Sequence, residues 1–217
     1  MGRIHRYEGE KVIVEFELSR CIHTGDCTRD LPAVFDAKRS GRWAHPDAAP
    51  AGEVARVCAN CPTGALRCIN KNTGSAMDTA PPHANSVQVI PDGPLYVHAQ
   101  MTLNGEPLTV HRAAFCRCGK SRLMPYCDNS HREAEFSDTG VISITLPSEA
   151  PAGVMLAITF KPGAPLLLEG PFTLLDASGA EACKNGKGAM CRCGASNMKP
   201  YCDGSHNATS FETDIQD

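Results

Sequence analysis

The chain has 217 residues, a formal net charge of −3 and no block of basic residues, so nucleic acid and anionic membranes are not expected as partners. No segment approaches the roughly 18 apolar residues of a membrane-spanning helix, and residues 1–16 scatter charges where a secretory signal would be apolar. We therefore expect a soluble, cytoplasmic protein with no membrane partner. In that compartment its 12 cysteines are better explained by metal ligation than by disulfides.

Residues 1–72 predict a small unit of their own. The stretch KVIVEFEL, residues 11–18, alternates as a strand does, and DLPAVFD, residues 30–36, indicates a short helical turn. Helix-forming residues 47–61 follow and end at Cys61-Pro62. Residues 73–86 are rich in Pro, Gly, Ser and Thr, which predicts a linker.

The rest of the chain predicts two repeats, residues 87–147 and 148–217. A sixteen-residue stretch, CRCGKSRLMPYCDNSH at 116–131, recurs 75 residues later as CRCGASNMKPYCDGSH at 191–206. Short alternating apolar runs, punctuated by Pro and Gly, surround both stretches and indicate antiparallel strands rather than long helices. The fold class predicted for the chain is therefore α+β.

The repeat also extends upstream of the cysteines. The stretch PLYVHAQMTL, residues 94–103, lies over PLLLEGPFTL, residues 165–174, with an offset of 71. The second copy therefore carries a four-residue insertion ahead of its cysteines, in the region of CKNGKG.

Each copy supplies three cysteines and one histidine at identical spacing: Cys116, Cys118, Cys127 and His131, then Cys191, Cys193, Cys202 and His206. Three thiolates and one imidazole suit either a tetrahedral zinc ion or a 2Fe–2S cluster. Zinc sites of this kind usually use C-x2-4-C loops, which aim backbone N–H groups at the sulfurs, and C-x-C is expected to do so less well. The spacing therefore favours iron and sulfur, with zinc as the alternative.

The second copy resembles the CDGSH iron–sulfur (NEET) family, whose motif is C-x-C-x2-[ST]-x3-P-x-C-D-G-[SAT]-H. The first copy has Asn129 at the glycine position, and asparagine best tolerates the left-handed backbone that glycine would adopt there. Two motifs in one chain look like the tandem, monomeric branch. The resemblance implies a 2Fe–2S cluster on each motif and a pseudo-twofold unit in which an antiparallel β-cap joins cluster-binding loops and short helices.

The N-terminal unit resembles divergent single-cluster ferredoxins, with Cys21, Cys27 and Cys61 as the implied ligands. Thr24 stands where common ferredoxins place a further cysteine, so three ligands favour a 3Fe–4S cluster. If Cys58 also ligates, the same unit would hold a 4Fe–4S cluster; we interpret Cys58 instead as a packed thiol. Cys68 and Cys183 fit neither pattern and are also interpreted as packed or incidental thiols.

The sequence contains no nucleophile–base arrangement, phosphate loop or nucleotide fingerprint, so no enzyme is predicted. The leading interpretation is electron transfer with a redox partner protein. The alternative is a labile iron–sulfur carrier that serves apo acceptors, or a redox and pH sensor; a zinc-binding interaction module is a third. A histidine ligand predicts potentials that fall with pH and cluster loss below about pH 6.5.

Overall fold

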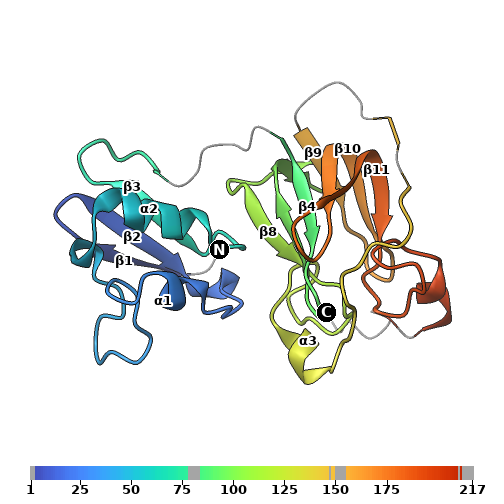
Figure 1. The fold of residues 1–217 in the computed structure, drawn as a ribbon, viewed down its shortest axis with the longest axis horizontal. Helices are drawn as coiled ribbons and strands as arrows, with labels where there is room; N and C mark the ends of the chain where they lie inside the picture. Colours follow the sequence, from blue (N-terminus) through green and yellow to red (C-terminus); the bar gives the residue numbers. More distant parts are fainter. Residues whose placement is uncertain (1–2, 78–83, 147, 150–154, 210, 212–217) are drawn as a thin grey trace. The chain divides into compact units, whose positions relative to one another are not determined.

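The structure is a computed structural model that describes residues 3–77, 84–146, 148–149, 155–209 and 211. The chain divides into two compact units, Met1–Ala80 and Pro81–Asp217 (Figure 1). Helices and strands occur in both, which confirms the α+β class. The division falls within the predicted linker, of which residues 78–83 lie outside the described part of the chain. In that described part, none of the helices is long and apolar enough to cross a membrane.

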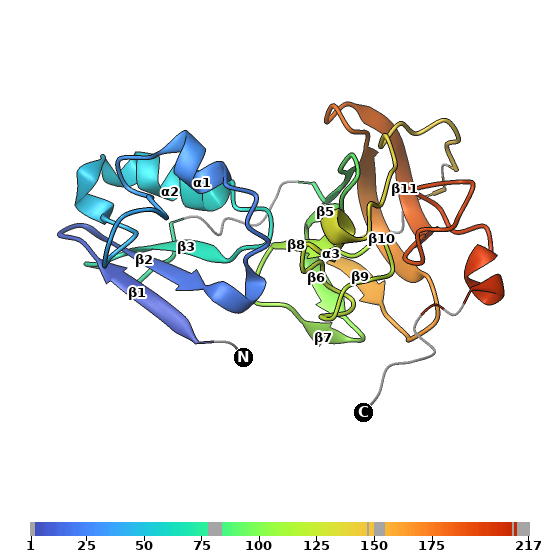
Figure 2. The same cartoon turned by 90° about the horizontal axis from the view of Figure 1, so that it is seen from below.

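The N-terminal unit is a three-stranded antiparallel sheet in the order β1-β2-β3 with short helices on one face (Figure 2). Its elements are β1 (Ile4–Glu8), β2 (Val12–Glu17), η1 (Leu18–Arg20), α1 (Asp26–Asp30), η2 (Pro46–Ala48), α2 (Ala51–Ala59) and β3 (Leu66–Asn70). The strand predicted at 11–18 is β2, and the predicted helix is α2. The helical turn predicted at 30–36 is confirmed, because the N–H groups of Val34 and Phe35 both donate to the carbonyl of Leu31; α1 directly precedes it.

Helix α2 packs against the sheet through one apolar face. Its buried residues, Val54, Ala55, Val57 and Cys58, follow helical spacing. Trp43 packs against this core. Its ring contacts the rings of Tyr7, Phe16 and Phe35, at centroid distances of 5.9, 5.0 and 5.6 Å.

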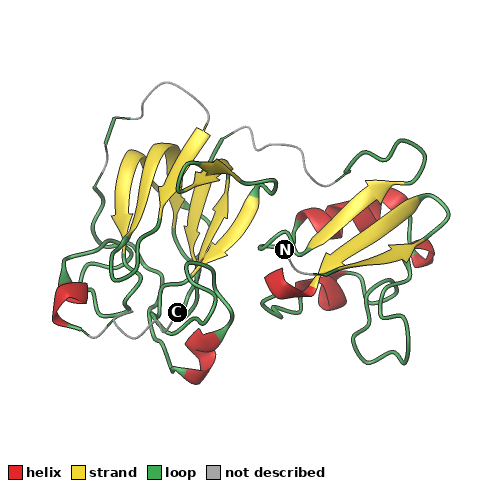
Figure 3. Ribbon diagram, turned by 180° about the vertical axis from the view of Figure 1, so that it is seen from behind, coloured by secondary structure: helices red, strands yellow, loops and turns green. Residues whose placement is uncertain are grey.

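The C-terminal unit is built on one eight-stranded sheet. Its order is β7-β6-β9-β10-β4-β5-β8, with β11 also paired to β10. The strands are β4 (Ser86–Val89), β5 (Leu95–His98), β6 (Gln100–Leu103), β7 (Glu106–Pro107), β8 (Arg112–Phe115), β9 (Met155–Thr159), β10 (Leu166–Leu175) and β11 (Glu181–Met190). The cysteine-rich loops of both copies, with α3 (Ser130–Glu133) and η3 (Ser205–Ala208), lie at the same end of these strands (Figures 1 and 3).

The first strand of each copy pairs with a strand of the other copy as well as with a strand of its own. Strand β4 pairs antiparallel with β5 of its own copy and parallel with β10 of the second copy; β9 pairs antiparallel with β10 and parallel with β6 of the first. The parallel registers correspond, since Ser86 faces Thr173 and Ala157 faces Thr102, each shifted by the same 71 residues. Both copies therefore share one hydrophobic core, which includes Leu95, Phe115, Leu166, Leu174 and Met190.

Candidate metal centres

In the first copy, the predicted ligands form two pairs. Strand β8 ends at Phe115 and delivers Cys116, whose Sγ lies 3.6 Å from Sγ of Cys118. The other pair lies at the start of α3: Cys127 precedes the helix, and its Sγ lies 3.4 Å from Nδ1 of His131 in the first turn. Each predicted ligand of the first copy thus lies close to one other ligand.

The second copy repeats this geometry. Strand β11 delivers Cys191, whose Sγ lies 3.8 Å from Sγ of Cys193, and Sγ of Cys202 lies 3.2 Å from Nδ1 of His206. On one tetrahedral metal, with bonds of about 2.0–2.3 Å, two sulfur ligands lie about 3.8 Å apart and a sulfur and a nitrogen ligand about 3.5 Å apart. The Cys–Cys pairs, at 3.6 and 3.8 Å, match this spacing, and the Cys–His pairs, at 3.4 and 3.2 Å, are slightly shorter. The two members of each pair are therefore close enough to share one metal atom.

A two-iron cluster needs two ligands at each iron, which the two pairs of each motif provide. Among the described residues, no group of three or more His, Cys, Asp or Glu side chains closes on one point as a single metal ion requires.

Equivalent side chains fix both loops. Ser121 Oγ donates to the carbonyl of Tyr126 at 2.6 Å, and Ser196 Oγ donates to that of Tyr201 at 2.7 Å. Asp128 accepts from the backbone N–H groups of Arg122 and Ser130, and Asp203 accepts from those of Asn197 and Ser205, all at 2.9–3.0 Å. Each aspartate therefore ties the middle of its loop to the turn that carries the histidine.

The residue after each aspartate places an N–H group on a ligand sulfur. Asn129 has φ = 78° and Gly204 has φ = 88°, so the left-handed backbone expected at Asn129 is confirmed. Their N–H groups donate to Sγ of Cys127 and Cys202, both at 3.4 Å. These bonds stabilise the thiolate form that binds a metal.

The C-x-C turns also direct backbone N–H groups at sulfur. The hydrogen bond between the Cys116 and Cys118 side chains lowers the pKa of Cys116, and the N–H groups of Ser121 and Gly119 lower it further; those of Ser196 and Gly194 act in the same direction on Cys191, against its burial. These N–H groups belong to residues that follow the second cysteine of each C-x-C turn; that such a turn aims fewer N–H groups at sulfur than a C-x2-4-C loop stays a prediction. Burial nevertheless raises the pKa of Cys191 to about 11, so a positive metal centre would be needed to hold the thiolate.

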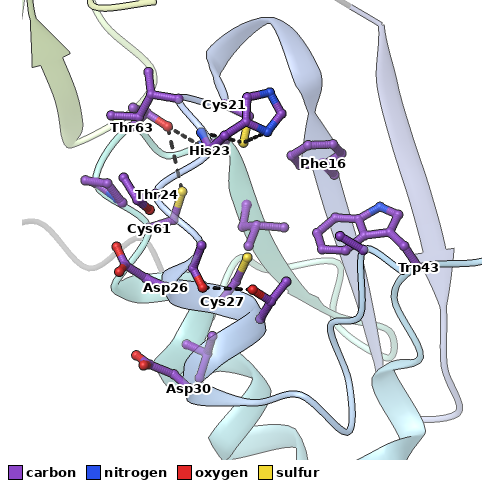
Figure 4. A pocket seen from close by; sticks show the side chains of 18 of the residues that line it. Phe16, Cys21, His23, Thr24, Asp26, Cys27, Asp30, Trp43, Cys61 and Thr63 are labelled. Carbon is purple, nitrogen blue, oxygen red and sulfur yellow. Dashed lines mark hydrogen bonds between the residues drawn. The ribbon is translucent and has the colours of Figure 1, made fainter. Parts of the chain in front are cut away.

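The three cysteines predicted in the N-terminal unit line one cavity of about 490 Å³ (Figure 4). Cys21 follows η1, Cys27 lies in α1, and Cys61 follows α2, so three separate elements supply the thiols. Burial, together with the nearby thiolates of Cys61 and Cys21, raises the pKa of Cys27 to about 11. The sulfurs are thus close enough to repel one another, which a metal cluster would relieve.

Other residues of this unit lie as follows. Cys58 is fully buried in the core under α2 and does not line the cavity. Thr24 and His23 do line it, and Nδ1 of His23 lies 3.8 Å from Sγ of Cys21. Sequence reasoning missed Thr63, whose Oγ1 lies 3.7 Å from Sγ of Cys61.

The two remaining cysteines lie apart from the ligand pairs. Cys68 is fully buried in the same core as Cys58. Cys183 packs partly buried on the C-terminal core, where its Sγ lies 3.6 Å from Oη of Tyr201 and 3.1 Å from Nδ2 of Asn185.

Comparison with known proteins finds a separate family match in each of the two units. The family model described as an iron-binding zinc finger of CDGSH type matches residues 92–132 and 163–207, and the divergent 4Fe–4S mono-cluster model matches residues 7–71. The uncharacterized protein YjdI of Escherichia coli strain K12, and its counterpart in strain O157:H7, are 38% identical over 70 residues, which cover 32% of this chain and 91% of YjdI. No solved structure matches.

The ligand sets and the two family models define an iron–sulfur protein. The chain belongs to the CDGSH iron–sulfur family in its C-terminal unit and to the divergent 4Fe–4S mono-cluster family in its N-terminal unit.

Proposed function

We propose that the protein transfers electrons and carries two 2Fe–2S clusters and one 3Fe–4S cluster. The ligands of the 2Fe–2S clusters are Cys116, Cys118, Cys127 and His131 for one, and Cys191, Cys193, Cys202 and His206 for the other. The ligands of the 3Fe–4S cluster are Cys21, Cys27 and Cys61. The observation that carries the proposal is the division of each CDGSH ligand set into one Cys–Cys pair and one Cys–His pair at 3.2–3.8 Å.

The finer description of the fold belongs to the same proposal. The C-terminal unit is a pseudo-twofold tandem, which the matching parallel registers of β4 with β10 and of β9 with β6 support. The N-terminal unit is ferredoxin-like, supported by its match to the mono-cluster model.

Bound clusters supply one-electron oxidation and reduction, and the protein's residues set how readily an electron is accepted. Neutral His131 or His206 in place of a fourth thiolate makes each site less negative by one charge, which raises its reduction potential. The N–H groups of Asn129 and Gly204 act in the same direction, because a hydrogen bond to sulfur stabilises added negative charge.

The type of the N-terminal cluster follows from its ligands. Three cysteines line the cavity, Thr24 stands in the place of a fourth, and Cys58 lies in the core instead. We therefore propose a 3Fe–4S cluster, although the matching family model is described by a 4Fe–4S cluster.

One observation favours a second function, transfer of a labile cluster to an apo iron–sulfur acceptor. His131 and His206 are only partly buried, so acid could reach the imidazole and weaken its bond to iron. A redox partner protein, the absence of enzymatic activity, the cytoplasmic location and the monomeric state stay predictions.

Anaerobically purified full-length protein tests the proposal. We expect visible absorption, iron and sulfide, an EPR signal from the N-terminal cluster as isolated, and 2Fe–2S signals after dithionite reduction. Reduction by a reductase should be much faster than cluster transfer to an apo-ferredoxin. Faster transfer would favour the carrier function, and a colourless protein containing zinc would overturn both.

A further inference from the structure

Two arginines are buried at the centre of the CDGSH unit. Arg117 lies between Cys116 and Cys118 and is 2% exposed; Arg192 occupies the same position in the second motif and is 1% exposed. A buried cation is costly unless charges and hydrogen bonds compensate it. If Arg117 and Arg192 served only to separate two cysteines along the chain, their positions would not require a charged side chain.

Each guanidinium is held in a defined position by its own copy. Arg117 donates through Nη1 to Oδ2 of Asp138 at 2.8 Å and through Nε to the carbonyl of Gly93 at 2.7 Å. Arg192 donates through Nη1 to the carbonyls of Ala164 at 2.9 Å and Lys161 at 3.1 Å.

The rings on which these arginines lie also belong to their own copies. Arg117 lies over Phe136 at 5.2 Å, and Arg192 over Phe160 and Phe211 at 4.3 and 5.1 Å. Each charge is thus fixed in place and buried.

The two C-R-C loops also lie directly against each other. Cys118 and Cys193 pair as an antiparallel bridge. A Cβ on Gly119 would lie 3.1 Å from the carbonyl oxygen of Cys193, and one on Gly194 would lie 3.2 Å from that of Cys118. The loops can approach this closely because both positions are glycine with positive φ.

The arginines reach across this junction. Nη2 of Arg192 lies 3.3 Å from Sδ of Met124, which belongs to the first motif. Burial lowers the pKa of Arg192, Cys116 of the first motif and Cys193 of its own raise it, and the net pKa is about 10. Burial also lowers the pKa of Arg117, whereas Asp138 and, more weakly, Cys191 of the second motif raise it. Each guanidinium therefore interacts electrostatically with a cysteine of the other motif.

We propose that Arg117 and Arg192 are positioning residues whose charges raise the reduction potential of the cluster in the opposite motif as well as in their own. The inference rests on the proposed 2Fe–2S clusters. A fixed cation in a medium of low dielectric constant stabilises the electron that a nearby cluster gains, and water screens it little. The two clusters are thereby tuned by a common pair of charges.

The test reads the first cluster by itself in full-length protein. The variant His206→Cys gives the second cluster four thiolates and lowers its potential, so the two clusters titrate separately in an EPR-monitored redox titration. In this background, Arg192→Met should lower the midpoint of the first cluster by at least the equivalent of a tenfold change in its one-electron equilibrium, about 59 mV. Arg192→Lys, which keeps the charge, should restore most of that shift.

A matched control and a variant of opposite sign complete the design. Arg132→Met removes an exposed arginine next to His131 and should shift the first cluster much less, because water and salt screen it. Asp138→Asn removes the carboxylate beside Arg117. In a His131→Cys background it should raise the midpoint of the second cluster, and it provides the test if the arginine variants do not fold.

The outcomes separate the inference from the proposed function. If both 2Fe–2S clusters are present but the midpoint of the first is unchanged in Arg192→Met, the inference is overturned. An equal shift in Arg192→Lys and Arg192→Met would also overturn it, because the effect would then come from packing. A sample with no 2Fe–2S signal would overturn the proposed function, and the inference with it.

Discussion

Asn129 and Gly204 occupy the same left-handed backbone position in the two motifs, at φ = 78° and 88°, and donate the same hydrogen bond to sulfur. Asparagine in the first motif and glycine in the second thus satisfy the same requirement for a left-handed backbone. The position demands a conformation, and the space around it is open: a Cβ on Gly204 would lie 3.9 Å from its nearest neighbour, Nδ2 of Asn207.

This relationship predicts opposite results for two substitutions of one residue. Gly204→Asn should retain its cluster and its thermal stability, because it copies the first motif. Gly204→Val should cost about 1–2 kcal/mol, because a β-branched side chain is strained at positive φ. Iron content and the midpoint of thermal unfolding measure both. Equal loss in the two variants would contradict a purely conformational requirement.

The buried serine in the second loop should matter for stability. Oγ of Ser196 donates to the carbonyl of Tyr201 and accepts from N–H of Met198 at 3.0 Å. Ser196→Ala leaves both backbone groups without these bonds, at a cost of about 1–3 kcal/mol. Thermal unfolding should show a clear loss, whereas Ser178→Ala, at an exposed turn, should change little. Equal midpoints for the two variants would contradict the role of Ser196.

Acid should release the first cluster through His131. Burial, with Arg132 and Arg117, lowers the pKa of His131 below its ordinary value, so folding favours the neutral imidazole. That stabilisation is fully present above the unfolded pKa, about 6.5, and is lost as pH falls through the lower folded pKa. Cluster absorbance should therefore decline below about pH 6.5, and potentials should fall as pH rises. Potentials independent of pH at both clusters would count against His131 and His206 as ligands.

Cys58 and Cys61 should respond differently to the same change. Cys61→Ala removes a thiol from the cavity and should abolish the N-terminal cluster. Cys58→Ala removes a thiol from the core and should cost about 1 kcal/mol of stability while the cluster remains. EPR and iron analysis compare the variants. Loss of the N-terminal cluster in Cys58→Ala would instead identify Cys58 as a fourth ligand.

Local chemistry made much of this protein predictable. The spacing of Cys116, Cys118, Cys127 and His131 placed four donors on one loop, and the left-handed position of Asn129 followed from the tolerance of its side chain. Helix α2 also followed from periodicity, since it buries one face. Strand β2 followed from the alternation within residues 11–18, although Val12, Ile13 and Val14 are all buried in the structure.

Long-range pairing was not predictable in the same way. The parallel contacts of β4 with β10 and of β9 with β6 join residues far apart in sequence, and alternation within a strand does not specify its neighbour. The burial of Arg117 and Arg192 depends on how the two loops meet. Arginine is rarely buried, so nothing in the motif indicated an interior cation.

Mössbauer spectroscopy of iron-enriched, anaerobic, full-length protein tests most directly whether each CDGSH motif holds a pair of bridged irons with unequal ligands. We predict, in the oxidised state, two 2Fe–2S centres in which one iron has only sulfur ligands and the other has sulfur and imidazole. A spectrum in which all the irons have thiolate and sulfide ligands alone, or a protein that holds zinc at these motifs, would contradict the account.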